Sequence, residues 1–238
     1  MDVAGIAIYL RLTDPRSLVV PLELERSEQI RELASALAPG DTFVDVGANH
    51  GSFSVAAARL VGPEGLVVSF EPQPALAPLV RRSLRELGSA PFVVHELACS
   101  DHDGEADFFI PRATSGAAGL LSDISARSPG ETVRVQVRRF DEAVDWRAFP
   151  GDLLVKLDVE GSEAAFLRGA ARALSARRPR ILMEVNPGAI EAAGRGPGSS
   201  LRQTLLELGY TRARPVGFPD VEDLATMDWT RRRNVLVS

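Results

Sequence analysis

Several residue types that particular kinds of site require are nearly absent from this chain. Cys99 is the only cysteine among the 238 residues, so no disulfide can form within the chain and a cysteine-based zinc site is excluded. This fits a reducing compartment, and we expect the protein in the cytoplasm. Lys156 is the only lysine among 27 basic residues, which are otherwise arginine. That skew is typical of coding bias rather than of function, but it singles out Lys156 for attention.

Long apolar runs and a basic surface are also missing. No stretch approaches the ~18 consecutive apolar residues that suggest a membrane-spanning helix. The N-terminus does not combine a basic segment with a long apolar one, so we expect no secretory signal. The net charge of −5 argues against a large nucleic-acid surface, which normally needs a basic face. We therefore expect neither a membrane nor a nucleic acid as partner.

What the sequence does contain is a regular alternation of strand and helix signals, which predicts an α/β fold. Hydrophobic residues make up 45% and charged residues 25%, as in ordinary globular domains. Because no obvious linker interrupts the alternation, we expect one domain over 1–238. Within it we expect an N-terminal helical cap at 1–40 and an inserted hairpin at 104–140, near the pocket for a substrate.

The expected elements follow from apolar periodicity, caps and turn residues. Strands are expected at 42–46, 66–70, 92–98, 153–159 and 180–185. Helices are expected at 28–37, 52–60, 74–87, 163–174 and 201–208. The hairpin would use 107–111 and 132–139, a mobile Gly-rich loop would span 188–200, and a final antiparallel pair would use 210–216 and 234–237.

The most informative segment is 43–54, FVDVGANHGSFS, an apolar strand that runs into a glycine-bearing turn and a helix. Gly47 and Gly51 let the backbone approach a ligand closely, and free N–H groups at the helix start suit a carboxylate or phosphate. A dinucleotide-binding turn would have glycine at 47, 49 and 52, but Asn49 and Ser52 occupy two of these positions. The turn therefore favours a smaller charged group, such as the amino-acid end of S-adenosylmethionine.

Neighbouring strand ends complete a pattern typical of nucleoside-binding sites in open α/β sheets. Glu71 closes the strand after the turn, where a carboxylate can accept hydrogen bonds from both ribose hydroxyls. Asp45, just under the turn, could organise the loop or bind the cofactor's ammonium group through water. Ala98 and its small neighbours leave room for an adenine ring. The residue that meets the adenine amino group stays open among Glu96, Ser100 and Asp101.

The fourth expected strand carries charges at alternate positions in VKLDVEGSE at 155–163. Strand alternation would point Lys156, Asp158 and Glu160 to one side, which is costly unless the charges are paired or hydrated. We expect Lys156 to form an ion pair with a neighbouring carboxylate. Asp158 and Glu160 would lie at the carboxyl end of the strand, where ligands bind, and Glu184 could complete an acidic pocket. These three carboxylates could hold Mg²⁺, but we predict no metal.

Taken together, these segments resemble the FkbM-type family of S-adenosylmethionine-dependent methyltransferases. The resemblance rests on FVDVGANHGSFS at 43–54, VVSFEPQP at 67–74, ELACSDHDG at 96–104, VKLDVEGSEAAFLRGA at 155–170 and ILMEVNP at 181–187. It implies a class I, Rossmann-like fold, in which a seven-stranded, mostly parallel sheet with a reversed C-terminal hairpin has helices on both faces. Nothing before residue 27 matches well enough to be transferred.

The resemblance implies S-adenosylmethionine as cofactor and a small molecule, natural product or sugar, as acceptor of the methyl group on a hydroxyl. The predicted cofactor-binding residues are Asp45, Gly47, Ala48, Asn49, Gly51, Phe53, Glu71, Pro72, Ala98 and Asp158. Asp158 and Glu160 are the predicted catalytic residues, because either carboxylate could take the acceptor's proton. His50 joins them as a candidate: it fills a position that is commonly apolar in the family, and could face the methyl-transfer centre or solvent.

Two other functions are open to the sequence. An NAD(P)-dependent oxidoreductase is opposed by the missing glycines in the first turn. A short-chain dehydrogenase would also need a tyrosine four residues from a lysine, but the tyrosines are Tyr9 and Tyr210, far from Lys156. A domain that only binds a ligand is the second alternative. The identity of the acceptor and the oligomeric state are not determined by the sequence.

Overall fold

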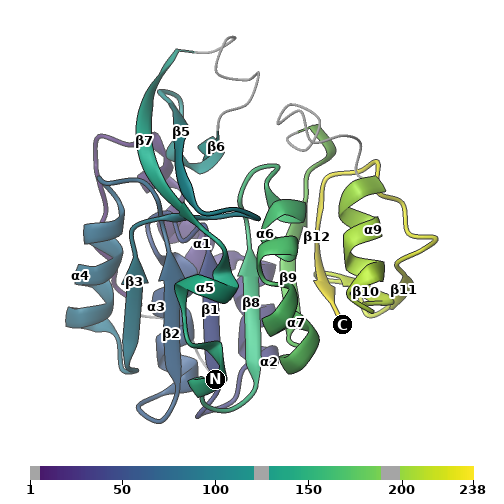
Figure 1. Ribbon diagram of the computed structural model, residues 1–238. Helices are drawn as coiled ribbons and strands as arrows, with labels where there is room; N and C mark the ends of the chain where they lie inside the picture. Colours follow the sequence, from purple (N-terminus) through teal and green to yellow (C-terminus); the bar gives the residue numbers. More distant parts are fainter. Residues whose placement is uncertain (1–5, 121–128, 189–198) are drawn as a thin grey trace.

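The computed structural model describes residues 6–120, 129–188 and 199–238, and its centre is a mixed β-sheet (Figure 1). In these residues the main sheet is 8-stranded, with the order β11-β10-β12-β9-β8-β1-β2-β3. The parallel strands are β1 (Thr42–Val46), β2 (Leu66–Phe70), β3 (Phe92–His95), β8 (Leu153–Leu157) and β9 (Arg180–Val185). Antiparallel pairing adds β12 (Arg233–Val237), β10 (Arg212–Pro215) and β11 (Glu222–Asp223).

This topology is the Rossmann-like sheet expected from the sequence, with one more strand than the expected seven. β12 runs antiparallel to β9 and to β10, so the last long strand is reversed as expected. The additional strand is β11, a two-residue edge strand that pairs with β10. So short a segment carries no periodic apolar pattern, and it could not be predicted for that reason.

Helices cover both faces of the sheet, because successive strand residues point into two separate cores. Phe43 faces one core and Val44 the other. The helices of the first core are α1 (Val20–Arg26), α2 (Glu28–Ala36), α3 (Ser52–Val61) and α4 (Ala77–Leu87). The helices of the second core are α5 (Phe140–Ala143), α6 (Glu163–Gly169), α7 (Ala171–Arg177) and α9 (Ser199–Glu207).

A smaller sheet lies over one end of the main sheet (Figure 1). It consists of β4 (Ala98–Cys99), β7 (Gly130–Arg138), β5 (Gly104–Pro111) and β6 (Gly119–Leu120), in that order. β5 and β7 pair antiparallel and form the hairpin expected from segments 107–111 and 132–139. Its own apolar cluster includes Phe108, Val135 and Val137.

Two expected strands end earlier than the sequence predicted, and one expected helix is interrupted. The strand expected at 92–98 ends at His95, and Ala98 joins the smaller sheet as part of β4. The helix expected at 163–174 is divided into α6 and α7 at Ala170. The strand expected at 153–159 ends at Leu157, which matters most for function because the two predicted catalytic carboxylates follow it. Most of the loop expected at 188–200 lies outside the described residues.

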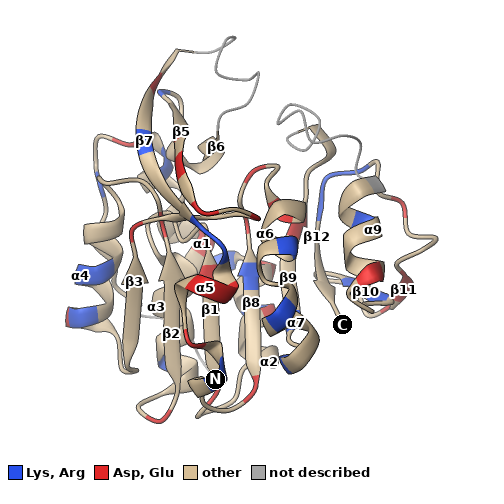
Figure 2. Cartoon of the chain, in the orientation of Figure 1, with Lys and Arg blue, Asp and Glu red and all other residues tan. Residues whose placement is uncertain are grey.

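Charged side chains of both signs are interspersed over the elements (Figure 2). Before α2 the structure contains the 3-10 helix η1 (Pro15–Leu18) and α1, which lie within the segment expected to form a helical cap but were not located individually from the sequence. In the described part of the chain, no helix has the length and apolar character needed to cross a bilayer.

Candidate active site

A cavity of about 400 Å³ lies at the carboxyl ends of β1, β2 and β8. Ligands bind at this edge in open α/β sheets, and the volume is within the range that a small ligand fills. Residues predicted from the sequence that line it are Gly47, Asn49, Glu71, Pro72, Ala98, Asp158 and Glu160. The cavity therefore brings together residues from separate segments that were selected from the sequence.

The turn after β1 requires glycine at position 47. Gly47 has a φ of 84°, in the left-handed region, and a Cβ at this position would overlap the carbonyl oxygen of Asp158. The backbone N–H groups of Gly47 and Ala48 both donate to the carbonyl oxygen of Phe70, at 3.0 Å. The turn is thus packed tightly between the ends of β2 and β8, which only a residue without a side chain allows.

Glu71 is held at the end of β2 by two backbone donors. The N–H of Asn49 donates to Oε2 at 2.6 Å, and the N–H of Gln73 donates to Oε1 at 2.8 Å. The side chain is nearly inaccessible to solvent, and this burial raises the pKa of Glu71 to about 7, although both hydrogen bonds oppose the rise. A buried carboxylate that lines a cavity is a fitting acceptor for the paired hydroxyls of a ribose.

Lys156 forms the ion pair that the sequence predicted. Its Nζ lies 3.1 Å from Oδ2 of Asp158 and 3.9 Å from Oδ1 of Asp45, and the side chain is only 5% exposed. Burial alone would lower the pKa of Lys156, but the two carboxylates raise it above its usual value. Asp45 is fully buried below the turn, where Ser54 Oγ donates to its Oδ2 at 2.6 Å. Asp45 thus supports the turn and does not line the cavity.

β8 ends at Leu157, but the carboxylate of Asp158, the next residue, lies on the same side as Lys156, 3.1 Å from its Nζ. Glu160 has a φ of 46°, so the chain turns away from the strand direction at this residue. The predicted alignment with Lys156 is therefore confirmed for Asp158, whereas strand alternation does not reach Glu160. Both still line the cavity, and their carboxylates approach that of Glu184 to within 4.8 Å. The acidic pocket predicted from these three residues is present.

The acidic pocket has an unusual electrostatic state. Burial, followed by repulsion from Asp158 and Glu184, raises the pKa of Glu160 to about 8. Arg232 holds Glu184 through two contacts, Nε to Oε1 at 2.7 Å and Nη2 to Oε2 at 3.0 Å. Glu160 is thus the member of the pocket that can exchange a proton near neutral pH. The absence of a metal from this oxygen-rich cluster remains a prediction.

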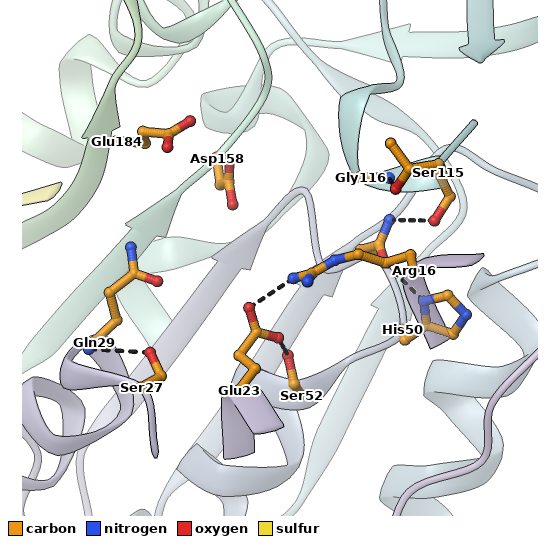
Figure 3. Close-up of polar contacts among 12 residues, drawn as sticks. Arg16, Glu23, Ser27, Gln29, His50, Ser52, Ser115, Gly116, Asp158 and Glu184 are labelled. Atoms are coloured by element: carbon orange, nitrogen blue, oxygen red, sulfur yellow. Dashed lines mark hydrogen bonds and ion pairs between the residues drawn. The ribbon is translucent and has the colours of Figure 1, made fainter. Parts of the chain in front are cut away.

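Four other predicted site residues lie behind the cavity wall. Ala48 and Phe53 pack in the core under α3, and the ring of Phe53 lies 4.6 Å from Lys156 Nζ. Gly51 has a φ of 85° and precedes the first residue of α3. His50 is buried and points toward the N-terminal segment, with Nδ1 2.8 Å from Asn49 Oδ1. The expectation that His50 could face the methyl-transfer centre or solvent is corrected, because Asn49 reaches the cavity and the next side chain points away from it (Figure 3).

None of the three candidates for the adenine amino group lines the cavity. Glu96 is exposed, and Ser100 is buried with its N–H bonded to the carbonyl oxygen of Arg138. Asp101 forms an ion pair with Arg168 on the outside of the molecule. The wall in this region consists of Leu97, Ala98 and Cys99. The chain enters β4 here, which the prediction of one continuous strand did not anticipate.

The sequence did not single out two groups of residues that line the cavity, although one of them lies in the 104–140 insertion that was expected near the substrate pocket. The N-terminal segment supplies Arg16, Glu23 and Gln29. Glu23 accepts from Arg16 Nη2 at 2.6 Å and from Ser52 Oγ at 2.6 Å (Figure 3). The other group is 114–118, around the 3-10 helix η2 (Ser115–Ala117). Neither group carries a sequence motif. The only local signals are Asp14 and Thr114, which cap the N-termini of η1 and η2 and could have indicated ordered turns at these positions.

Comparisons with known proteins agree with this geometry. The sequence matches the Methyltransferase FkbM domain family over residues 45–212, well over half of the chain. The AMB antimetabolite synthetase AmbE of Pseudomonas aeruginosa is 29% identical over 209 residues, which is 73% of this chain and 10% of that protein. The chain thus spans about a tenth of the length of this curated relative.

Solved structures of methyltransferases have a similar fold. Methyltransferase FkbM from Methylobacillus flagellatus KT has a TM-score of 0.50 and 16% identity, over 92% of this chain and 60% of that chain. A SAM-dependent methyltransferase from Aquifex aeolicus has a TM-score of 0.46 and 12% identity, over 100% of this chain and 97% of that one. The resemblance inferred from the sequence motifs is confirmed: the chain belongs to the FkbM family of methyltransferases, with S-adenosylmethionine as its cofactor.

Proposed function

We propose that this protein transfers the methyl group of S-adenosylmethionine to a hydroxyl oxygen of a small molecule, a natural product or a sugar. The observation that carries the proposal is a cavity that joins two carboxylates of different character. Glu71 is buried and held by backbone donors, whereas Glu160 sits among other acids with its pKa raised to about 8. The first suits recognition of a nucleoside, and the second suits removal of a proton.

Glu71, Gly47 and Asn49 are the residues that would hold the cofactor. The carboxylate of Glu71 accepts two backbone hydrogen bonds and has lone pairs left for ribose hydroxyls. Gly47 lines the cavity at the turn after β1, where the amino-acid end would lie. Leu97, Ala98 and Cys99 form a mainly apolar wall for the adenine ring. When bound, S-adenosylmethionine supplies an electrophilic methyl group on its sulfur.

Glu160 is the residue best suited to act as general base. A hydroxyl group must lose its proton as its oxygen forms a new bond to carbon, and a base with a pKa near the working pH accepts that proton efficiently. Burial and neighbouring acids raise the pKa of Glu160 to about 8, while Asp158 is tied to Lys156. We therefore assign proton removal to Glu160 and the positioning of the acceptor to Asp158.

The size and charge of the site support a small acceptor rather than a nucleic acid. The cavity has a volume of about 400 Å³. Its polar lining also includes Arg16, Glu23, Gln29 and Arg232, which can form hydrogen bonds with hydroxyl groups. The curated relative is named as an antimetabolite synthetase, and this supports an acceptor from the biosynthesis of small molecules.

The test is a methyl-transfer assay with methyl-labelled S-adenosylmethionine and a panel of hydroxylated natural products and sugars. We expect label in a methyl ether, identified by mass spectrometry and NMR, together with an equal amount of S-adenosylhomocysteine. The variant Glu160→Gln should bind the cofactor normally but transfer the methyl group about 10²- to 10⁴-fold more slowly. Exposed Glu142→Gln is the matched control. Label on nitrogen or on a carboxylate, or full activity of Glu160→Gln, would overturn the proposal.

A further inference from the structure

Three segments that are distant in the sequence meet around His50. The His50 ring nitrogen Nδ1 lies 2.8 Å from Oδ1 of Asn49, in the turn after β1. Asn49 Nδ2 donates to Ser115 Oγ at 3.0 Å, and His50 Nε2 lies 3.7 Å from Oδ2 of Asp14. His50 is 1% exposed and does not line the cavity. It therefore lies directly behind a wall to which all three segments contribute.

The partners of Asn49 determine which nitrogen of His50 carries hydrogen. Because the Asn49 amide nitrogen donates to Ser115 Oγ, the amide oxygen is the atom that faces His50. An amide oxygen only accepts, so Nδ1 must be the donor. In the neutral ring Nε2 then carries a lone pair, and it has no hydrogen-bond partner among the described residues. Burial lowers the pKa of His50 even though Asp14 opposes this, which keeps the ring neutral.

Asn49 has a left-handed backbone conformation that its neighbours hold in place. Its φ of 52° lies in a region that asparagine enters more readily than most residues with a side chain, and surrounding contacts maintain it here. In this conformation its N–H donates to Glu71 Oε2 at 2.6 Å. His50 and Ser115 bind the two ends of the Asn49 amide, and so hold in place the residue that orients Glu71.

Asp14 connects the contacts around His50 to other residues of the cavity wall. Its Oδ1 accepts from the N–H of Arg16 at 3.0 Å and from the N–H of Ser115 at 3.3 Å. Arg16, Asn49 and Ser115 all line the cavity. Asp14 lies before residues 45–212, which match the FkbM family, so these contacts link the N-terminal segment to the turn after β1.

We propose that His50 is a positioning residue: through its Nδ1–H it orients Asn49, and thereby fixes the Glu71 carboxylate and the cavity wall for the nucleoside of the cofactor. This inference rests on the proposed placement of the cofactor against Glu71. The sequence suggested a catalytic role for His50. In this proposal His50 instead affects how tightly the nucleoside of the cofactor binds. His50 touches neither the cavity nor a reacting atom, and it acts only through Asn49.

Amide substitutions can separate the two nitrogens of the ring. In His50→Asn the amide nitrogen can occupy the position of Nδ1, so the donor to Asn49 is kept. In His50→Gln the longer side chain places its amide nitrogen near the position of Nε2, facing Asp14, and the donor to Asn49 is lost. His50→Leu keeps volume but no donor. His102→Leu, at an exposed histidine away from the cavity, is the control.

The measurement is the affinity for S-adenosylhomocysteine by titration calorimetry, with the melting temperature of every variant recorded separately. We expect His50→Asn to bind within about threefold of the unmodified protein, and His50→Gln and His50→Leu to bind about tenfold more weakly, as for loss of one buried hydrogen bond. The difference in affinity between the Asn and Gln variants must persist when their melting temperatures agree. A role of His50 in stability alone would not produce such a difference.

Two results would overturn the inference. One is equal affinity across the Asn, Gln and Leu variants, and the other is an Asn variant as weak as the Leu variant. If the Leu variant does not fold, the Asn and Gln pair still decides. Failure of the proposed cofactor placement is distinguishable, because the unmodified protein would then not bind S-adenosylhomocysteine, or Glu71→Gln would bind it as tightly; failure of hydroxyl methylation would show only in the transfer assay.

Discussion

The backbone N–H of Asn49 donates a 2.6 Å hydrogen bond to Oε2 of Glu71 and ties the turn after β1 to the end of β2. Gln73 donates to the other carboxylate oxygen from the following turn. Glu71 is thereby fixed by neutral backbone donors, and burial raises its pKa to about 7. Its charge thus depends on pH in the neutral range, and this makes its role in binding measurable.

Glu71→Gln should weaken the binding of S-adenosylhomocysteine about 10- to 100-fold, because hydrogen bonds to a charged acceptor are worth roughly 1.5–3 kcal/mol. The unmodified protein should bind more weakly as the pH falls through about 7, since burial raises the pKa of Glu71 to that value and protonation removes the charged acceptor. The glutamine variant should lack this pH dependence. Calorimetry at a series of pH values checks both effects.

Glu96→Gln is the matched control for this experiment, since Glu96 is exposed and does not line the cavity. Its affinity should equal that of the unmodified protein at every pH. An affinity that does not change with pH in the unmodified protein would show that Glu71 does not contact the nucleoside as a carboxylate.

The sequence predicted those parts of the site whose structure is determined by a pattern within one short segment. The bounds of β1 and β2 agree with the prediction, because each is a short apolar run in a buried parallel strand between turn residues. Glu71 was found because it follows such a run, about twenty residues after the glycine-bearing turn. The ion pair of Lys156 followed from the cost of burying a charge alone.

The parts that were missed depend on contacts between distant residues. His50 was assigned to the site because it fills a turn position that is commonly apolar in the family, but its direction is set by contacts with Asn49 and Asp14 that a single segment does not specify. Arg16 reaches the cavity because Asp14 caps η1 and contacts Ser115. The left-handed conformation of Glu160 ends the alternation of β8, and non-glycine residues give little signal for it.

Gly47→Ala should be strongly destabilising. The added methyl group would overlap the carbonyl oxygen of Asp158, in backbone that cannot yield cheaply, and the left-handed φ of 84° adds strain. Gly40→Ala is the control, because Gly40 has a similar φ of 91° but no atom lies within 4 Å of the position that its added methyl group would take. We expect Gly47→Ala to lose more than about 3 kcal/mol of unfolding free energy and Gly40→Ala about 1–2 kcal/mol. Denaturant titration measures both, and equal losses would contradict the close packing at Gly47.

The rate of methyl transfer should rise with pH through about 8. Burial and the neighbouring acids raise the pKa of Glu160 to that value, so only above it is most of the proposed base ionised. Single-turnover rates with saturating cofactor separate this effect from the pH dependence of binding. Glu160→Gln should remove the rise together with most of the rate. A rate that is independent of pH in the unmodified protein would assign proton removal to another group.

Lys156→Met should destabilise the fold by about 3–5 kcal/mol, because it leaves the carboxylate of Asp45 fully buried without its cationic partner. Burial raises the pKa of Asp45 even with Lys156 present, so the loss of stability should become smaller as the pH is lowered and Asp45 takes up a proton.

Lys156→Met combined with Asp45→Asn should recover part of the stability, since the second change removes the unpaired charge. Arg134→Met, which breaks an exposed pair with Asp107, should cost far less than the loss of the buried pair. Urea titrations of these variants at several pH values test this, and a Lys156→Met protein as stable as Arg134→Met would show that the buried pair contributes little to the folded state.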